Sequence, residues 1–305
     1  MKKKYQKLSV TAIQLNTQSE DKEKNLKKIL KLIDAAAKDK PDIIVLPELC
    51  STPYWCSDIN NRYFSWAESI PGPTIKAIGE KASKHSFSIV VPIFEKGDIE
   101  GEYYNSAAVI GPDGRLIRGM SPDGKNYSSY RKVHLPVLNR PPVHLDEKYY
   151  FRPGSGFPVF TVGGRKIGIL ICWDRCFPEG WRTLALQGAE IIFMCSALLS
   201  WEPGTGASRA EQFLSEMRTR ALENQIFVVG CNKCGIESFT GTPIKFFGQS
   251  CVIDPYGTVM SLASSDDQAL LNEVLELKKV QEARLTLPFY HDRRPDLYSI
   301  IAESR

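Results

Sequence analysis

The stretch KIGILICWD, residues 166–174, decides the fold of this 305-residue chain. Its first part is an almost continuous apolar run of strand length, typical of a strand that is covered on both faces. A helix is expected near 178–187, followed by an apolar strand at 190–195. A helix at 208–223 and a strand at 226–230 continue the alternation. Such a succession predicts βαβ units and therefore an α/β fold.

The N-terminal part of the chain shows the same succession. Apolar residues recur at helical spacing within 21–39, with charged residues between them, which predicts an amphipathic helix. Residues 8–15 before this helix form one expected strand, and the branched apolar run 42–46 after it forms another. The N-terminal part is therefore expected to be a further βαβ unit.

Three turn sequences add antiparallel hairpins to these units: GPDG at 111–114, GG at 163–164 and DPYG at 254–257. With them the chain is expected to hold about a dozen strands and about five or six helices, more strands than one open sheet usually carries. The sheet is therefore expected to split into two packed layers. No linker or internal repeat divides residues 1–305, so we expect a single domain. An extended tail, at about 287–305, is expected to reach over a neighbouring subunit.

Composition and charge exclude several classes of protein. The chain has 39 basic and 35 acidic side chains, a formal net charge of +4, and this small excess gives no reason to expect nucleic-acid binding. No signal peptide is recognisable, and no apolar stretch approaches the ~20 residues of a membrane span. The eight cysteines are scattered, and the C-x-x-C pair Cys231 and Cys234 lacks a second ligand pair for zinc. We therefore expect a soluble, cytoplasmic protein with reduced cysteines and no membrane partner.

Functional sites of open α/β sheets gather at the carboxyl ends of strands, and reactive residues stand at such places here. Glu48 follows the strand at 42–46, where desolvation of its carboxylate suits a general base. Cys172 ends the strand at 166–171, and a sharp turn before a helix can display a nucleophile beside free backbone N–H groups. Lys132 alternates within a strand-like segment. Each residue alone also fits a structural role, as a surface carboxylate, a buried cysteine or a solvated lysine, so single residues leave the function open.

Together these contexts resemble a known family. LPE at 46–48, YRKVHLP at 130–136 and GILICWD at 168–174 stand in the order of the three signatures of the carbon–nitrogen hydrolase (nitrilase) superfamily. DRRPDLY at 292–298 is also similar to members of this family, so the resemblance covers nearly the whole chain. It implies a four-layer αββα sandwich, often assembled as a homodimer or higher homo-oligomer. The resemblance also implies a catalytic mechanism that requires no metal and no organic cofactor.

The resemblance also implies a catalytic triad of Glu48, Lys132 and Cys172. In this triad Glu48 takes the proton of Cys172, and the thiolate attacks the planar carbon of a C–N bond. Lys132, helped by the backbone N–H of Trp173, stabilises the oxyanion that develops. Glu48 then protonates the departing nitrogen and activates the water that hydrolyses the thioester.

A second glutamate of the family pairs with the lysine and positions it. Glu147, in HLDEKYYF at 144–151, matches this residue. Asp146 is adjacent and competes for the same match.

Within the superfamily the resemblance is closest to enzymes that act on N-carbamoyl compounds. FRPG at 151–154 with GFPV at 156–159 is similar to N-carbamoyl-D-amino acid hydrolases and to N-carbamoylputrescine amidases. His134 and His144 match histidines that line the site in the first of these groups, although a lone histidine more often has a structural role.

Two residues indicate opposite substrates. Arg175 stands where acid-type carbamoylases place an arginine, whose guanidinium holds a substrate carboxylate; its alternative is an ion pair with Asp174 or Glu179. Glu202 resembles a residue in a loop of the amine-type enzymes, where a carboxylate meets an ammonium. Arg175 favours an N-carbamoyl amino acid of the β-alanine or D-amino-acid type, hydrolysed to amine, CO2 and ammonia.

Other functions stay open as alternatives. Inside the enzyme class they are an N-carbamoylputrescine-type amidase, a simple aliphatic amidase and a nitrilase, which releases ammonia without CO2. Outside it they are a non-catalytic binding module on the same fold and a redox protein built on Cys231 and Cys234. All three triad positions are filled, which favours an enzyme with a small amide or carbamoyl substrate.

Overall fold

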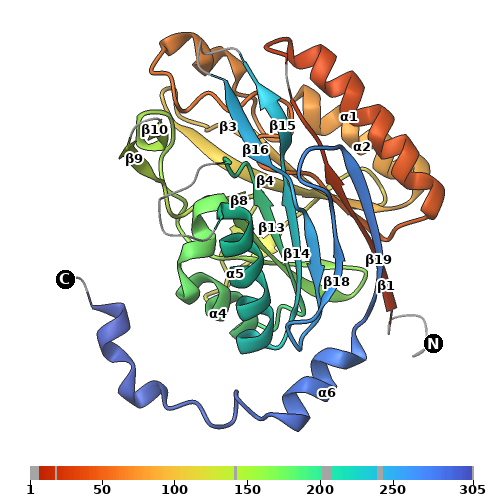
Figure 1. Cartoon of the computed structure of the whole chain (residues 1–305), viewed down its shortest axis with the longest axis vertical. Helices are drawn as coiled ribbons and strands as arrows, with labels where there is room; N and C mark the ends of the chain where they lie inside the picture. The colour runs from red at the N-terminus through yellow and green to blue at the C-terminus, as the bar shows by residue number, and fades with distance from the viewer. Residues whose placement is uncertain (1–6, 18, 141–142, 201–207, 239–242, 304–305) are drawn as a thin grey trace.

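Two stacked β-sheets form the centre of the computed structural model, which describes residues 7–17, 19–140, 143–200, 208–238 and 243–303 (Figure 1). The outer face of one sheet is covered by α1 (Lys22–Ala36) and α2 (Pro73–His85). The outer face of the other is covered by α4 (Pro178–Leu186) and α5 (Arg209–Asn224). The layers therefore follow the order α, β, β, α, and the expected four-layer sandwich is confirmed.

The first sheet has the strand order β19-β1-β2-β3-β4-β5, with β8 also paired to β4. Strands β1, β2 and β3 are parallel, and α1 connects the first two, which confirms the N-terminal βαβ unit. The bounds of the strands are β1 (Lys7–Gln14), β2 (Ile43–Val45), β3 (Ser88–Lys96), β4 (Tyr103–Ile110), β5 (Leu116–Ile117), β8 (Tyr130–Arg131) and β19 (Ala269–Glu276).

The second sheet has the order β18-β17-β14-β13-β12-β11-β6-β7. Its centre is parallel, from β12 through β13 to β14, as the stretch that begins at residue 166 predicts. All three predicted turns join antiparallel neighbours, namely β4 to β5, β11 to β12 and β17 to β18. The bounds of the strands are β6 (Gly119–Met120), β7 (Asn126–Tyr127), β11 (Val159–Val162), β12 (Arg165–Ile171), β13 (Ile191–Ser196), β14 (Phe227–Asn232), β17 (Cys251–Ile253) and β18 (Val259–Leu262).

Short elements connect and extend the two sheets. Two small hairpins pair β9 with β10 and β15 with β16. The bounds are β9 (Val137–Arg140), β10 (Val143–Asp146), β15 (Cys234–Glu237), β16 (Ile244–Phe247), α3 (Glu147–Tyr150), α6 (Lys278–Thr286) and the 3-10 helices η2 (Ala37–Asp39), η3 (Asn61–Trp66), η4 (Cys172–Cys176), η5 (Pro295–Leu297) and η6 (Ser299–Ala302). After α6 the chain leaves the sandwich as an arm, drawn in blue in Figure 1. This arm holds the turns η5 and η6, so the expected extended tail is interrupted by helical turns.

Buried branched side chains explain why the central strands read as continuous apolar runs. In β2, Ile43 and Val45 face the second sheet and join the core between the two layers. Ile44 faces the other way, into the core beneath α1 and α2. Both faces of the strand are therefore covered, as its composition predicts. Within the described residues, no helix is both long and apolar enough to cross a membrane.

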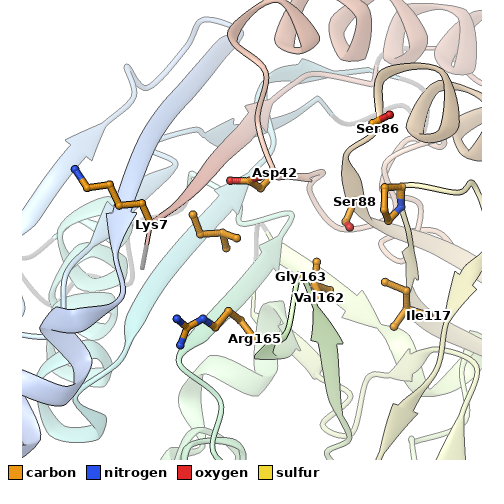
Figure 2. A pocket seen from close by; sticks show the side chains of 10 residues that line it. Lys7, Asp42, Ser86, Ser88, Ile117, Val162, Gly163 and Arg165 are labelled. Atoms are coloured by element: carbon orange, nitrogen blue, oxygen red, sulfur yellow. The ribbon is translucent and has the colours of Figure 1, made fainter. Parts of the chain in front are cut away.

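A cavity of about 260 Å³ opens between the sheets where their central parallel strands begin (Figure 2). Its charged side chains already have partners: Lys7 pairs with Glu276, Arg165 pairs with Glu190, and Asp42 accepts the N–H of Ser9. The carboxyl ends of the same strands lie at the opposite end of the sandwich, where the sequence places its reactive residues.

Candidate active site

Cys172 occupies a sharp turn directly after β12. Its backbone φ is +47°, in the left-handed region that residues with a side chain rarely adopt, and η4 begins at this residue. Such strain persists only where the surrounding structure enforces it, and it is common at functional sites. The strand–turn–helix geometry expected for a displayed nucleophile is therefore present.

Glu48 is fully buried just beyond β2 and is held from three segments of the chain. Its Oε1 accepts hydrogen bonds from Lys132 Nζ at 2.8 Å and from Asn105 Nδ2 at 2.7 Å. Its Oε2 accepts the backbone N–H of Ala197 at 2.9 Å. Because Asn105 belongs to β4 of the first sheet and Ala197 follows β13 of the second, both sheets fix this carboxylate. The alternative of a surface carboxylate is wrong.

The ammonium of Lys132, directly after β8, is enclosed between two carboxylates. Its Nζ lies 2.8 Å from Oε1 of Glu48 and 2.7 Å from each carboxylate oxygen of Glu147. Burial alone would lower the pKa of Lys132, but the charges of Glu147 and Glu48 raise it well above its usual range. The alternative of a solvated lysine is wrong, and Lys132 stays protonated at neutral pH.

A close backbone crossing holds the Lys132 segment in place. The N–H of Lys132 donates to the carbonyl of Asn105 at 2.8 Å, and the N–H of Gly154 donates to the carbonyl of Lys132 at 2.8 Å. A Cβ on Gly154 would lie only 2.0 Å from the carbonyl oxygen of Arg131. Only glycine therefore fits at this position, which gives the FRPG motif at 151–154 a structural reason.

Glu147 is the first residue of α3 and supplies the second carboxylate. Its Oε1 also accepts the hydroxyl of Tyr54 at 2.8 Å. Burial raises the pKa of Glu147 to about 7, against the lowering influence of Lys132. Asp146 has another task, because its side chain accepts the N–H of Tyr149 and caps α3. The carboxylate that contacts the lysine is thus that of Glu147.

The thiol of Cys172 is neutral in the resting protein. Burial raises its pKa far above the usual value; the charge of Glu48 acts in the same direction, and Lys132 opposes it. A neutral thiol is a weak nucleophile and needs a base to accept its proton. The buried cluster provides such a base in Glu48 and an ammonium for developing negative charge in Lys132.

A cavity of about 310 Å³ reaches Cys172 and is large enough for a small substrate. Most of its wall is apolar, and the charged side chains among its lining residues are those of Arg175 and Arg209. The remaining lining residues are Tyr54, Pro136, Leu138, Leu145, Trp173, Ala197, Leu198 and Leu199.

Arg175 lines this cavity, but its guanidinium is engaged by the protein. The side chain is 2% exposed, and its Nε lies 2.7 Å from Oε2 of Glu216 on α5. Its Nη1 donates to the carbonyl of Cys172 at 3.4 Å, and its guanidinium lies 5.8 Å from the ring centre of Trp173. The expectation that an ion pair of Arg175 would use Asp174 or Glu179 is corrected here: the partner is Glu216.

His134 lies beside the turn after Cys172 and is absent from the lining residues of the cavity. Its Nδ1 is 2.8 Å from Oδ1 of Asp174, and its ring stacks on that of Phe177 with 3.7 Å between centroids. Asp174 also accepts the hydroxyl of Tyr130 at 2.6 Å. The histidine therefore supports the turn that carries the nucleophile.

Of the other two residues expected to bind substrate, the structure describes only His144. His144 is exposed on β10, opposite Asn139, and does not line the cavity. Glu202 lies outside the described residues.

Four contributors to the site stand in no recognisable sequence motif: Tyr54, Asn105, Arg209 and Glu216. Tyr54 stands six residues after Glu48 in the same segment, and this proximity is the one hint that the sequence displays. The contacts of Asn105 with Glu48 and of Glu216 with Arg175 join residues far apart in the chain, so only the folded sheets and helices bring them together.

The C-x-x-C pair is buried, and its surroundings differ from those of a reactive dithiol. Cys231 and Cys234 are free thiols, and burial raises the pKa of Cys234 to about 11. Redox-active and metal-binding cysteines instead have lowered pKa values. Within the described residues, His, Cys, Asp and Glu side chains form no group of three that could hold a metal ion.

Comparison with known proteins gives a consistent result. Residues 9–285 match the family model described as carbon-nitrogen hydrolase. The chain is 33% identical to an N-carbamoylputrescine amidase of Solanum lycopersicum over 99% of this chain and 97% of the relative, and 32% identical to a citrullinase of Francisella tularensis over 96% and 98%. Its fold is similar to the crystal structure of a carbon-nitrogen hydrolase from Helicobacter pylori, with a TM-score of 0.86, 28% identity and coverage of 97% and 99%.

Proposed function

Because the chain belongs to the carbon–nitrogen hydrolase family, and is therefore a hydrolase of C–N bonds other than peptide bonds, we propose that it hydrolyses an N-carbamoyl amino acid. The products are the amine of the amino acid, CO2 and ammonia. The observation that carries this proposal is the charge of the cavity at Cys172, where the charged lining side chains among the described residues are two arginines.

In the proposed mechanism Glu48 accepts the proton of the Cys172 thiol, and the thiolate adds to the carbamoyl carbon. The carbonyl oxygen becomes an oxyanion, which the ammonium of Lys132 and the backbone N–H of Trp173 stabilise. Glu48 returns its proton to the departing nitrogen, and the C–N bond breaks to leave a thioester on Sγ. Water, deprotonated by Glu48, then releases a carbamic acid, which decomposes to CO2 and the second nitrogen product.

Glu147 serves this mechanism through Lys132. It contacts the ammonium with both oxygens, so it holds the cation in place when the charge on Glu48 is neutralised by the incoming proton. A lysine with one remaining carboxylate partner stays protonated and can stabilise the oxyanion.

One observation supports a carbamoyl substrate, and a second supports a carboxylate on that substrate. The names of the two relatives identify a carbamoylated amine and citrulline, a ureido amino acid, as their substrates. The arginines of the cavity would attract a carboxylate and repel the free ammonium of a carbamoylated diamine. N-carbamoylputrescine is the second candidate, because relatives that carry this name align over almost the whole chain.

The test is the release of ammonia and CO2 from a panel of compounds, each measured beside Cys172→Ala. The panel holds N-carbamoyl-D- and L-amino acids, N-carbamoyl-β-alanine, citrulline, N-carbamoylputrescine, a simple aliphatic amide and a nitrile. Preferred turnover of a carbamoyl acid, lost in Cys172→Ala, is the expected result. A preference for N-carbamoylputrescine, or ammonia release without CO2, would contradict the proposed substrate class.

A further inference from the structure

We infer that Arg209, at the start of α5, binds the carboxylate of the substrate, while Arg175 beside it is a structural cation that positions the site. This inference rests on the proposed function, because it needs a substrate that carries a carboxylate. Recognition of the substrate carboxylate is thereby assigned to Arg209 on α5, and not to Arg175, which follows the nucleophile Cys172 closely in the sequence.

Arg175 is poorly available to a ligand. It is almost completely buried, and its charge is compensated by Glu216 at 2.7 Å. A further N–H points back to the carbonyl of Cys172. These contacts join the turn at the nucleophile to α5, so the geometry of Arg175 serves the protein itself.

Arg209 is in a different situation, although it lines the same cavity. It is partly exposed, and its Nη1 donates to the neutral amide oxygen of Gln212 at 2.7 Å. Within the described part of the chain, no acidic side chain forms an ion pair with Arg209. Its guanidinium therefore has N–H donors for a ligand in the cavity, and none of the acidic side chains that the structure describes serves as its counter-ion.

The charges around Arg209 at this end of the cavity favour the binding of an anion. Burial and the neighbouring charge of Arg175 lower the pKa of Arg209, and the charge of Glu216 offsets this only in part. Arg175, Arg209 and Glu216 together carry a net charge of +1. A bound carboxylate would bring the net charge of this group to zero, whereas an ammonium would add a third cation.

The wall of the cavity indicates what lies between the two ends of the substrate. Its residues other than Cys172, Trp173 and the arginines are apolar or aromatic: Tyr54, Pro136, Leu138, Leu145, Ala197, Leu198 and Leu199. A ureido group at Cys172, methylene groups along this wall and a carboxylate at Arg209 would match the lining. The substrate class is thus a ureido acid with an apolar spacer.

The kinetic test compares Arg209→Gln with the parent enzyme on two compounds that differ only in the anion. N-carbamoyl-β-alanine is the acid, and N-ethylurea, which keeps its ureido group and two-carbon chain, is the neutral partner. We expect kcat/KM for the acid to fall about 10- to 100-fold, mainly through KM, the loss typical of a charged hydrogen bond. N-ethylurea should lose far less, so the ratio of the two substrates changes by a similar factor.

Two further variants make this comparison specific. Arg218→Gln removes an arginine from an exposed position of the same helix, outside the cavity, and should leave the ratio unchanged. Arg175→Lys breaks the geometry of the ion pair with Glu216 and should lower turnover of both compounds by similar factors. An equal loss on both compounds in Arg209→Gln, or a selective loss of the acid in Arg175→Lys alone, would overturn the inference.

A labelling experiment separates failure of the inference from failure of the proposed function. Cys172 is alkylated with N-bromoacetylglycine and, separately, with N-ethylbromoacetamide, and the rates are followed by mass spectrometry. We expect Arg209→Gln to slow labelling by the anionic reagent about tenfold and to leave the neutral reagent nearly unaffected. If no ureido acid is hydrolysed but this selectivity holds, the proposed substrate fails and the carboxylate subsite stands. If ureido acids are hydrolysed but labelling and KM do not depend on Arg209, the inference fails and the proposed function stands.

Discussion

The pKa of Glu147, raised by burial to about 7, places the charge of the buried cluster within the physiological pH range. Below that pH the carboxylate is protonated, and the two hydrogen bonds that it accepts from Lys132 lose their ionic character. The hydroxyl of Tyr54 acts against this, because its hydrogen bond to Oε1 stabilises the charged carboxylate. The hydroxyl of Tyr54 thus helps to set the pH above which Glu147 is ionised.

Replacement of Tyr54 by Phe is therefore expected to move the acidic limb of the pH–rate profile. In the parent enzyme kcat/KM should fall about tenfold per pH unit once the pH drops below the Glu147 pKa of about 7. Loss of the hydroxyl removes an influence that lowers this pKa, so the limb in Tyr54→Phe should lie at higher pH. The measurement is kcat/KM from pH 5 to 9 for both proteins. A limb that does not move would mean that ionised Glu147 is not needed.

Glu48→Gln is expected to remove the base with little change in size. Turnover should fall about 10²- to 10⁴-fold, because an amide cannot accept the proton of the Cys172 thiol. The amide nitrogen would also face either Lys132 or the N–H of Ala197, both of which are donors. We therefore expect a further loss of about 1–3 kcal/mol in the free energy of unfolding. Activity assays and urea unfolding separate the two effects, and near-normal turnover in a folded variant would reject Glu48 as the base.

At the scale of elements, a second buried ion pair fixes the segment that carries Glu48 and Tyr54. Lys233, between β14 and β15, donates from Nζ to the carbonyl of Thr52 at 2.7 Å and to Glu237 Oε1 at 3.0 Å. Glu237 in turn accepts the backbone N–H of Tyr54 at 2.6 Å. The connection between β14 and β15, together with Glu237 at the end of β15, thereby holds the loop after β2 in place.

Removal of one partner from this buried pair is expected to be costly. In Glu237→Gln the ammonium of Lys233 stays buried without its counter-charge, so the free energy of unfolding should fall by about 3–5 kcal/mol. The double variant Lys233→Met with Glu237→Gln should recover a large part of this loss, because no unpaired charge remains. Urea unfolding of the parent, the single variants and the double variant measures the coupling. Additive losses would show that the pair does not act as a unit.

The elements that the sequence predicted well are those with long apolar runs and clear ends. The β12–turn–α4 succession, the α1 helix and three hairpins were all expected, because burial on both faces and turn chemistry act locally. Strands of two residues, such as β6 and β7, were not, since two residues carry no periodicity. The same limit applies to the site. Glu48, Lys132 and Cys172 stand in recognisable motifs, whereas Tyr54 meets Glu147 across 93 positions of the chain, a contact that only the tertiary fold creates.

At the scale of the whole molecule, the arm after α6 exposes several apolar side chains. Leu297, Ile300 and Ile301 are each more than half exposed, and the arm borders a groove of about 700 Å³ beside α4. Monomers rarely expose apolar side chains in such a cluster. The arm also carries both signs of charge between residues 292 and 296, which suits contact with an identical copy. We propose that this face is buried in a homodimer or higher homo-oligomer.

Removal of residues 293–305 is therefore expected to weaken or abolish the oligomer. This cut keeps α6 and the contact of Tyr290 with the carbonyl of Asn224, so the sandwich retains its own packing. Light scattering after size-exclusion chromatography should give at least twice the chain mass for the parent, and a smaller assembly for the shortened chain. Leu297→Glu tests the same surface within the full-length chain, and should shift the mass downward because a charge cannot be buried there unpaired. A parent that is already monomeric, or variants with the parent's mass, would show that the arm has another use.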